Sequence, residues 1–400
     1  MKKILIINSV CGVGSTGKIS TKIHQLVNEE PDFQSKIIYF WGEKNENGKK
    51  LSSLVYQKYQ ALRSRVLGNY GKGAIINTLR AIAEIEKYDP QIVHLHNVHD
   101  HTVNVVMLLK HLKKRKVKVV WTFHDCWAFT GYCTHFSYEK CDKWITECHN
   151  CPLRKQYSWF FDRSSELYLQ KKDAIKDMDI TVVTPSIWLE NIVRRSFFKT
   201  KDILTIYNGI DLNVFRPTKS YFREKNNIEN KILLLGVAFG WSYKKGLDIF
   251  IELAKILDER FAIVLVGTDR EIDKMLPARI ISIHRTNSKS ELAEIYSSAN
   301  FFVNPTREEV FGLVNTEALA CGTPVIMFNT GGAPEAINEH CGRVTKCNDV
   351  SNLVAEIYNQ VEKCELYKDE CIRYAQKFDE EKQMKEYIQL YRDILQKGRQ

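Results

Sequence analysis

Short apolar runs alternate with stretches of helical periodicity along the whole chain. The runs are continuous and rich in β-branched residues, a pattern typical of parallel strands buried on both faces. They form two series of about six predicted strands each. The first covers residues 4–7, 35–40, 92–95, 118–123, 180–185 and 205–207, and the second covers 231–237, 261–266, 280–283, 301–304 and 324–328. Two such series separated by helices predict an α/β protein with two doubly wound, Rossmann-like domains.

The boundary between the two series lies in the segment IYNGIDLNVFRPTKSYFREKNN, which opens with the turn signal Asn208-Gly209. We therefore expect a first domain over residues 1–207 and a second over 208–375. The segment 376–400 has helical periodicity, and its apolar positions are Met384, Tyr387, Ile388, Leu390, Tyr391 and Ile394. Because such a face is normally buried, we expect this helix to pack back on the first domain.

Composition narrows the class of protein further. The chain has 400 residues, of which 44% are hydrophobic and 26% charged, as expected of a globular protein with room for two cores. It has no apolar run of the length that a membrane span needs. The apolar start of the chain is short and continues into a glycine-rich turn, which favours a first buried strand over a signal peptide. We therefore expect a cytoplasmic protein.

The net charge of +10 favours anionic partners. A dense basic segment spans residues 108–120, and its six cations are Lys110, Lys113, Lys114, Arg115, Lys116 and Lys118. One interpretation is a solvated helix end before a buried strand. The other is a surface that rests on anionic lipid headgroups, at the inner face of the plasma membrane. Nucleic acid is not expected as a partner, because no recognition helix or aromatic-interleaved basic strand accompanies the charge.

The segment SVCGVGSTGKIS, residues 9–20, is built like a phosphate-binding loop between a strand and a helix. It matches the triphosphatase motif G-x-x-x-x-G-K-[ST] up to Lys18. The next position, Ile19, stands where that motif needs a hydroxyl for magnesium, and it shares a helical face with apolar neighbours. A triphosphatase is therefore disfavoured, and the loop suits another phosphate ligand.

In the second domain, PTREEVFGLVNTEALACGTPVI places Glu309 and Glu317 eight residues apart. A carboxylate accepts two hydrogen bonds, so it suits the paired hydroxyls of a ribose or a sugar. Gly312 lets a diphosphate approach the backbone at a helix start, where free N–H groups and the helix dipole favour anions. The alternative interpretation is two surface glutamates beside a helix cap.

This pattern resembles the signature of family 4 retaining glycosyltransferases of the GT-B architecture. The resemblance rests on Glu309-x7-Glu317 with Phe311-Gly312, and on fragments that occur in the family's order. These are VHLHN at 93–97, TFHD at 122–125, VTPS at 183–186, IYNGID at 206–211, KKGLDIFIELA at 244–254 and ELAEIYSSANFFVNPT at 291–306. The resemblance implies two domains facing a central cleft, and transfer of a sugar from a nucleotide-diphosphate sugar to a glycan, which we expect to be lipid-linked and to belong to surface polysaccharide biosynthesis.

The resemblance also implies roles for matching positions. Glu317 is expected to hold the nucleotide ribose, and Glu309 to contact hydroxyls of the transferred sugar. Lys245 is expected to neutralise the departing diphosphate with the backbone N–H groups of Gly312 and Leu313. His124 is expected to reach the sugar from the first domain. The other donor-binding positions are Gly14 and Gly17, which would close over the diphosphate, and Lys244, Arg285 and Phe311.

The sequence departs from the family in one respect. Members commonly have an arginine several residues before the lysine, whereas GVAFGWSYK has none, and Lys244 offers only a point charge in its place. The resemblance implies retention of anomeric configuration and no catalytic metal. A glutamate nucleophile and the choice between UDP and GDP stay open. The rival functions are a nucleotide-sugar epimerase of the same architecture, the triphosphatase, and a non-catalytic binder of nucleotide sugars.

Four of the eleven cysteines cluster in GYCTHFSYEKCDKWITECHNCPL, within an insertion over about residues 126–165. Their spacing, C-x7-C-x6-C-x2-C, ends in the C-x2-C pair that is common in closed zinc sites. In a cytoplasm, such clustering favours metal over disulfides. We expect structural zinc at Cys133, Cys141, Cys148 and Cys151, with His135 or His149 able to replace one thiolate, and four unrelated thiols are the other interpretation. Some capsule- and colanic-acid-type members of the family look similar here.

Overall fold

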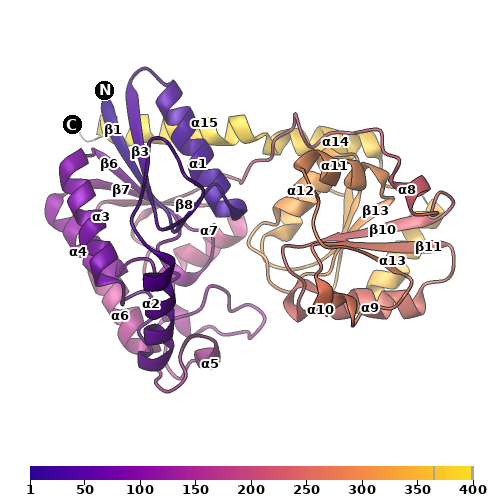
Figure 1. Ribbon diagram of the computed structural model, residues 1–400, viewed down its shortest axis with the longest axis horizontal. Coiled ribbons are helices and arrows are strands. Elements are labelled where there is room, and N and C mark those ends of the chain that lie inside the picture. Colours follow the sequence, from indigo (N-terminus) through magenta and orange to yellow (C-terminus); the bar gives the residue numbers. More distant parts are fainter. Residues whose placement is uncertain (364, 398–400) are drawn as a thin grey trace. The chain divides into compact units, whose positions relative to one another are not determined.

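The computed structural model describes residues 1–363 and 365–397, which form two compact units. Unit 1 comprises Met1–Tyr207 together with the chain from Met384 to its described end, and unit 2 comprises Asn208–Gln383. Each unit is an open parallel sheet with helices packed against it (Figure 1). The predicted fold class, two doubly wound α/β domains, is confirmed.

Unit 1 has a seven-stranded sheet with the strand order β5-β3-β1-β6-β7-β8-β9. Its strands are β1 (Lys2–Ile7), β3 (Phe33–Tyr39), β5 (Gly48–Lys50), β6 (Ile92–Leu95), β7 (Lys118–Thr122), β8 (Ile180–Thr184) and β9 (Asp202–Thr205), and β2 (Val10–Cys11) pairs with β4 (Trp41–Gly42) beside them. Its helices are α1 (Gly14–Glu29), α2 (Leu54–Leu67), α3 (Ile75–Tyr88), α4 (Val105–Arg115), α5 (Arg154–Tyr157), α6 (Ser164–Ile175), α7 (Ile187–Arg194) and α15 (Glu380–Lys397).

The last helix, α15, completes the core of unit 1. Tyr387, Ile388 and Tyr391 are buried in one cluster with Ile4 of β1 and Phe33 of β3. Helix α1 joins the same cluster, so the two helices share one face of the sheet. The last three residues of the segment expected to form this helix lie outside the described residues.

Unit 2 has a six-stranded sheet with the strand order β12-β11-β10-β13-β14-β15. Its strands are β10 (Ile232–Val237), β11 (Phe261–Val266), β12 (Ile280–Ile283), β13 (Phe301–Asn304), β14 (Val325–Phe328) and β15 (Gly342–Thr345). Its helices are α8 (Phe222–Lys225), α9 (Leu247–Ile256), α10 (Arg270–Asp273), α11 (Lys289–Ser298), α12 (Leu313–Ala320), α13 (Val350–Lys363) and α14 (Lys368–Ala375). All neighbouring strands are parallel, so their carboxyl ends meet at one edge, where ligands of such sheets bind.

Three edge strands differ from the prediction: β9 lies at other residues, and β5 and β15 were not predicted. The last strand of unit 1 is Asp202–Thr205 instead of 205–207, because Ile206 is buried by packing at a point where the chain is already leaving the sheet. Strand β15 was missed because its sequence, Gly-Arg-Val-Thr, has no continuous apolar run, and Val344 is exposed at the sheet edge.

The basic segment at 108–120 forms the end of α4 and the start of β7. Arg115 pairs with Glu86 and Asp89, and Lys118 pairs with Asp179. These ion pairs favour a solvated helix end over a lipid-facing surface at this position. No helix of the described residues combines the length and the apolar character needed to cross a bilayer.

Candidate functional site

In unit 2, adjacent strands bring two distant loops together. Strands β10 and β13 are parallel neighbours, so the loops that follow them emerge side by side. The loop after β10 holds a single 3₁₀ turn, Tyr243–Lys245, and the loop after β13 holds the predicted glutamates. The Lys245 ammonium lies 2.9 Å from a carboxylate oxygen of Glu309, and Lys244 pairs with the buried Glu308. The structure thus joins Lys245 and Glu309, two predicted site residues that are 64 positions apart.

Close contacts fix the backbone conformation around Glu309. Glu309 itself accepts a hydrogen bond from the Val310 N–H at 3.1 Å. A side chain at Gly331 would collide with the Glu309 carbonyl, so only glycine fits there. Gly312 has a φ of +81° and precedes α12, which begins at Leu313. The first N–H groups of α12 have no partner within the helix, so this turn offers donors to an anion.

The second predicted glutamate lies one turn before the end of α12. A carboxylate oxygen of Glu317 accepts a hydrogen bond from the Tyr296 hydroxyl at 3.1 Å. Burial, followed by the charge of Glu317, holds the pKa of Tyr296 well above its usual range, so the phenol stays a neutral donor. Tyr296 lies on α11 and was not predicted as a site residue, because a buried tyrosine in a helix looks like ordinary core. It fixes the orientation of a carboxylate that we expect to bind ligand.

Arg307 is a second residue that the sequence did not single out. Its guanidinium is buried and donates to both carboxylate oxygens of Asp248, at 2.8 and 2.7 Å. It also lies over the Tyr243 ring, 3.8 Å from the centroid, and the Arg307 backbone N–H donates to the Lys244 carbonyl. The expected family arginine before the lysine is absent, and this arginine instead braces the turn that carries Lys244 and Lys245.

The other predicted donor-binding positions fall in different surroundings. Arg285 is exposed in the loop after β12, at the same sheet edge. The Phe311 side chain is buried against Phe378, so its predicted contact with a donor could come only from its backbone. In unit 1, the predicted loop from Gly14 to Gly17 is the first turn of α1. Gly14 has a φ of +67° with open space around it, whereas Gly17 is buried against Val10.

The near match to a triphosphatase loop does not survive in the structure. The hydroxyl of Ser20, one place after the motif position, accepts from the Asn8 amide at 2.9 Å and is fully buried. Ile19 is buried in the core of unit 1, as its helical face indicated. Neither side chain can offer a hydroxyl to a magnesium ion.

The second predicted catalytic group, His124, lies at the end of β7 beside the end of β6. Its Nε2 is 2.9 Å from Nδ1 of His96, and the two rings stack with centroids 5.2 Å apart. Burial lowers the pKa of His124 to about 4, so the ring is neutral near pH 7. A neutral imidazole can exchange hydrogen bonds with uncharged sugar hydroxyls. His96 belongs to the VHLHN fragment but was given no role.

A charged cluster stands next to these neutral rings. His99 lies 2.8 Å from Asp125 and 2.8 Å from Asp100. Burial opposes protonation of His99, but the two carboxylates outweigh it and raise its pKa to about 10. Asp125 also accepts the Trp127 N–H, which fixes the start of the cysteine-rich insertion. Unit 1 therefore holds neutral and protonated imidazoles side by side at strand ends.

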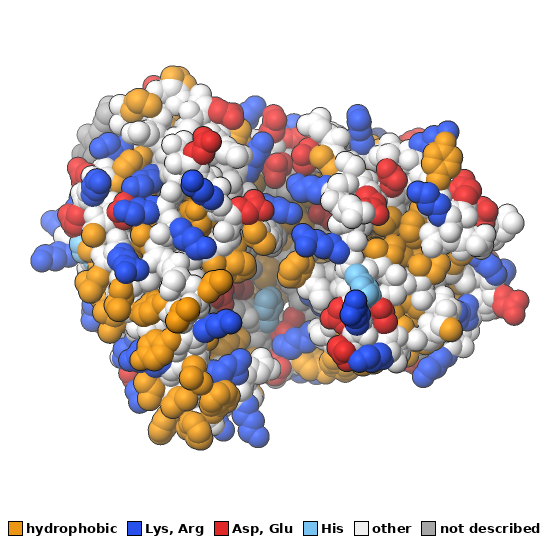
Figure 2. Space-filling view, viewed as in Figure 1, with side chains coloured by type: hydrophobic (Ala, Val, Ile, Leu, Met, Phe, Trp, Pro, Cys, Tyr) orange, Lys and Arg blue, Asp and Glu red, His pale blue; other side chains and the backbone are white. Residues whose placement is uncertain are grey.

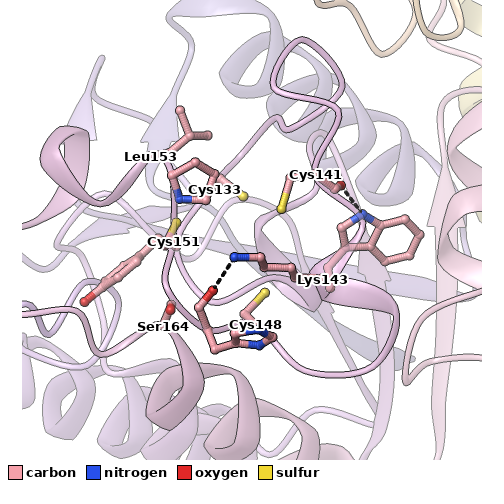
Figure 3. A pocket seen from close by; sticks show the side chains of 11 residues that line it. Cys133, Cys141, Lys143, Cys148, Cys151, Leu153 and Ser164 are labelled. Carbon is pink, nitrogen blue, oxygen red and sulfur yellow. Dashed lines mark hydrogen bonds between the residues drawn. The ribbon is translucent and has the colours of Figure 1, made fainter.

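The four clustered cysteines line one pocket in the insertion between β7 and α6 (Figure 3). Backbone groups order this segment: Trp144 donates to the Cys141 carbonyl, and the Gly131 N–H donates to the sulfur of Cys148. Burial raises the pKa of Cys148 and of Cys151 to about 11, so both are neutral thiols near pH 7. Among residues 1–363 and 365–397, no three or more His, Cys, Asp or Glu side chains lie so that together they could hold a metal ion, and the four thiols would have to converge to bind one.

Two family models match consecutive parts of the chain. Residues 59–214 match the model described as Glycosyltransferase Family 4, and residues 218–378 match the model described as Glycosyl transferases group 1. Together they match most of the chain and part of each unit. The chain belongs to the family 4 glycosyltransferases and is a glycosyltransferase enzyme.

Individual relatives agree with this assignment. The colanic acid biosynthesis glycosyl transferase WcaC of Escherichia coli K12 is 20% identical over 323 residues, which are 76% of this chain and 77% of the relative. The N,N'-diacetylbacillosaminyl-diphospho-undecaprenol alpha-1,3-N-acetylgalactosaminyltransferase of Campylobacter jejuni is 27% identical over 200 residues, 47% of this chain and 53% of the relative.

Solved structures show the same fold. Sucrose-phosphate synthase from Thermosynechococcus elongatus has a TM-score of 0.73 and 17% identity, and the match covers 99% of both chains. HepE from Anabaena, solved in complex with UDP-glucose, has a TM-score of 0.70 and 14% identity over 98% of this chain and 100% of that chain. The epimerase alternative gains no support from these comparisons.

Proposed function

We propose that this protein transfers a sugar, with retention of anomeric configuration, from a UDP- or GDP-sugar to a lipid-linked oligosaccharide in surface polysaccharide biosynthesis. The observation that carries the proposal is the meeting of Lys245 and Glu309 beside Gly312 and the start of α12. A cation, a carboxylate and helix N–H groups at one sheet edge are the groups that a diphosphate leaving group and a sugar require.

Each group then has one task. Glu317, oriented by Tyr296, binds the ribose hydroxyls, and Glu309 binds hydroxyls of the donor sugar. The diphosphate draws Lys245 away from its ion pair with Glu309, and the N–H groups of Gly312 and Leu313 share the charge. The bond between the anomeric carbon and the phosphate oxygen breaks as the acceptor oxygen bonds to the same face of that carbon. The acceptor proton passes to the departing phosphate oxygen.

Unit 1 is proposed to bind the acceptor side of the reaction. His124 is neutral and backed by His96, so it can hydrogen bond to sugar hydroxyls without adding charge. Gly14, with open space at the start of α1, leaves room for a phosphate of the donor. The names of the two relatives above, one of colanic acid biosynthesis and one acting on a diphospho-undecaprenol-linked sugar, support the class of acceptor.

We propose in addition that the cysteine cluster holds a structural zinc ion. Four thiols from one insertion line the same pocket, and thiolates are the donors that zinc prefers in closed sites. Because burial raises the pKa of Cys148 and of Cys151, zinc would have to displace their protons, and binding would weaken as the pH falls. Elemental analysis of the purified protein tests this. One zinc ion per chain is expected, and a protein without zinc contradicts it.

The function is tested with purified enzyme, a panel of nucleotide sugars and a diphosphate-lipid-linked sugar acceptor. Release of nucleoside diphosphate is followed with and without acceptor, and the product's anomeric configuration is determined by NMR. We expect acceptor-dependent release, a retained configuration, and loss of turnover in Glu309→Ala and Glu317→Ala. An isomerised donor sugar without acceptor, an inverted product, or wild-type turnover in both variants would contradict the proposal.

A further inference from the structure

Two helices of unit 1 expose their apolar side chains and bury polar ones. In α2, Gln60 and Ser64 are buried, while Leu54, Val55, Tyr59 and Leu62 face solvent. A surface helix of a globular protein normally has the opposite arrangement. The buried Gln60 Oε1 and Ser64 Oγ also lack hydrogen-bond partners among the described residues, so the helix gains little from the face it buries.

Helix α3 has the same inverted arrangement in its first two turns. Asn77 and Thr78 are fully buried, whereas Ile75, Ile76 and Leu79 are exposed. The seven apolar side chains of α2 and α3 are each between 47% and 79% exposed. The two helices are tied together because Arg63, on α2, donates to the Gly73 carbonyl just before α3.

An aromatic loop adjoins the end of α2. Trp159, Phe160 and Phe161 are exposed, and the Trp159 N–H donates to the Arg65 carbonyl at 2.7 Å. We call the exposed side chains of α2, α3 and this loop the apolar face, which consists of Leu54, Val55, Tyr59, Leu62, Ile75, Ile76, Leu79, Trp159, Phe160 and Phe161. Figure 2 shows hydrophobic side chains gathered over α2 and toward the tip that carries α5. Soluble monomers rarely expose so much contiguous apolar surface without a partner.

The charge around this face is mostly positive. Asp162 is exposed next to the aromatic loop, and Lys72 and Lys49 pair with Glu166 and Glu84. Residues 47–83 contain no aspartate or glutamate, and their seven cations are Lys49, Lys50, Lys58, Arg63, Arg65, Lys72 and Arg80. Lys58 and Arg65 are exposed on α2 itself, and Arg80 is exposed on α3. A second copy of this chain would bring like charges together, which disfavours self-association through the face. An anionic surface would be attracted.

We propose that the apolar face docks on an anionic phospholipid bilayer. The aliphatic side chains and the tip aromatics enter the boundary between headgroups and acyl chains, and the exposed Lys58, Arg65 and Arg80 contact lipid phosphates. Tryptophan suits this depth because it is apolar with one polar edge. The docking surface is therefore α2, α3 and the loop at 159–161, not the basic segment at 108–120, whose Arg115 and Lys118 are paired within unit 1.

The test is co-sedimentation of the full-length protein with vesicles. One set of vesicles is phosphatidylcholine alone and the other is an equimolar mixture with phosphatidylglycerol. We expect binding to the mixed vesicles, weakened by salt. Trp159→Ser with Phe160→Ser, and separately Lys58→Glu with Arg65→Glu, should each weaken it about tenfold or more. Met275→Ser with Ile256→Ser removes exposed apolar side chains from unit 2 and should leave binding unchanged.

Circular dichroism and thermal melting verify that the variants fold, which is expected because every changed side chain is on the surface. Failure of the wild-type protein to bind mixed vesicles overturns the proposal. Equal binding to both kinds of vesicle, unchanged by the charge-reversal variant, also overturns it. A third contradicting result is a dimer in light scattering that the Trp159→Ser, Phe160→Ser variant no longer forms. Since no donor or acceptor is present, the result is independent of the proposed reaction.

Discussion

Replacing Arg307 with lysine keeps the positive charge and removes the planar fork. In the wild-type structure, the guanidinium donates twice to Asp248, donates to Asn348 and lies over the Tyr243 ring. A lysine ammonium is a point charge and can keep one of the Asp248 contacts. At least two charge-assisted hydrogen bonds are lost, each worth about 1.5–3 kcal/mol.

The lower end of that range applies because Asp248 is 42% exposed. We therefore expect a loss of about 3 kcal/mol from the free energy of unfolding of unit 2. For a unit of this size, that corresponds to a Tm about 6–12 °C lower in differential scanning calorimetry. Because Arg307 also braces the turn that carries Lys245, donor affinity should fall in the variant at a temperature where it is still folded.

Isothermal titration with the donor identified in the panel measures that affinity. Arg260→Lys is the matched control, since Arg260 is an exposed arginine that pairs with Asp258 on the same unit. It should change neither the Tm nor the affinity appreciably, because exposed pairs contribute little. An Arg307→Lys protein with the Tm and donor affinity of the control would refute the assignment of Arg307 as the brace of this turn.

Three further predictions follow from the described contacts. Tyr296→Phe removes the hydroxyl that orients Glu317, so the donor Kd should rise about tenfold with kcat little changed, and an unchanged Kd would contradict the orientation. Burial lowers the pKa of His24 and of His124 from 6.5 to about 4. Between pH 6.5 and 4, these two histidines are therefore protonated in the unfolded chain and neutral in the folded chain. Each histidine should cost about 2 kcal/mol of stability between pH 7 and 5, and urea denaturation that gives equal stability at both pH values would contradict this. Cys148→Ser should abolish zinc binding and lower the Tm of unit 1, and a chelator should lower the wild-type Tm in the same way. Equal Tm values with and without chelator would contradict a structural metal.

The central strands were predictable from the sequence because burial on both faces leaves a continuous apolar run. Strands β6, β11 and β13 lie at their predicted bounds. Strand β15 is an edge strand with exposed positions, so its pattern carries little signal. The buried face of helix α2 could not be predicted from the sequence either. Its apolar side chains face outward, and helical periodicity alone cannot tell which face is buried.

The candidate site was predictable only in part, for a related reason. Motif positions such as Glu309 and Lys245 could be found from the sequence, but their ion pair depends on β10 and β13 being neighbours. Arg307 stands in the polar run Thr-Arg-Glu-Glu, which looks like solvated surface, yet it is buried because Asp248 and Tyr243 enclose it. Contacts with residues distant in the sequence bury Arg307, and the local sequence pattern does not reveal those contacts.

The most direct test of the account is sugar transfer by a Lys245→Gln protein in the nucleotide-sugar and acceptor assay. Lysine 245 carries the charge that meets the departing diphosphate, so turnover should fall about a hundredfold or more while the protein stays folded. Lys255→Gln, an exposed lysine on α9, should transfer at the wild-type rate. Equal turnover by the Lys245→Gln and Lys255→Gln proteins would contradict the placement of the reaction at this edge of unit 2.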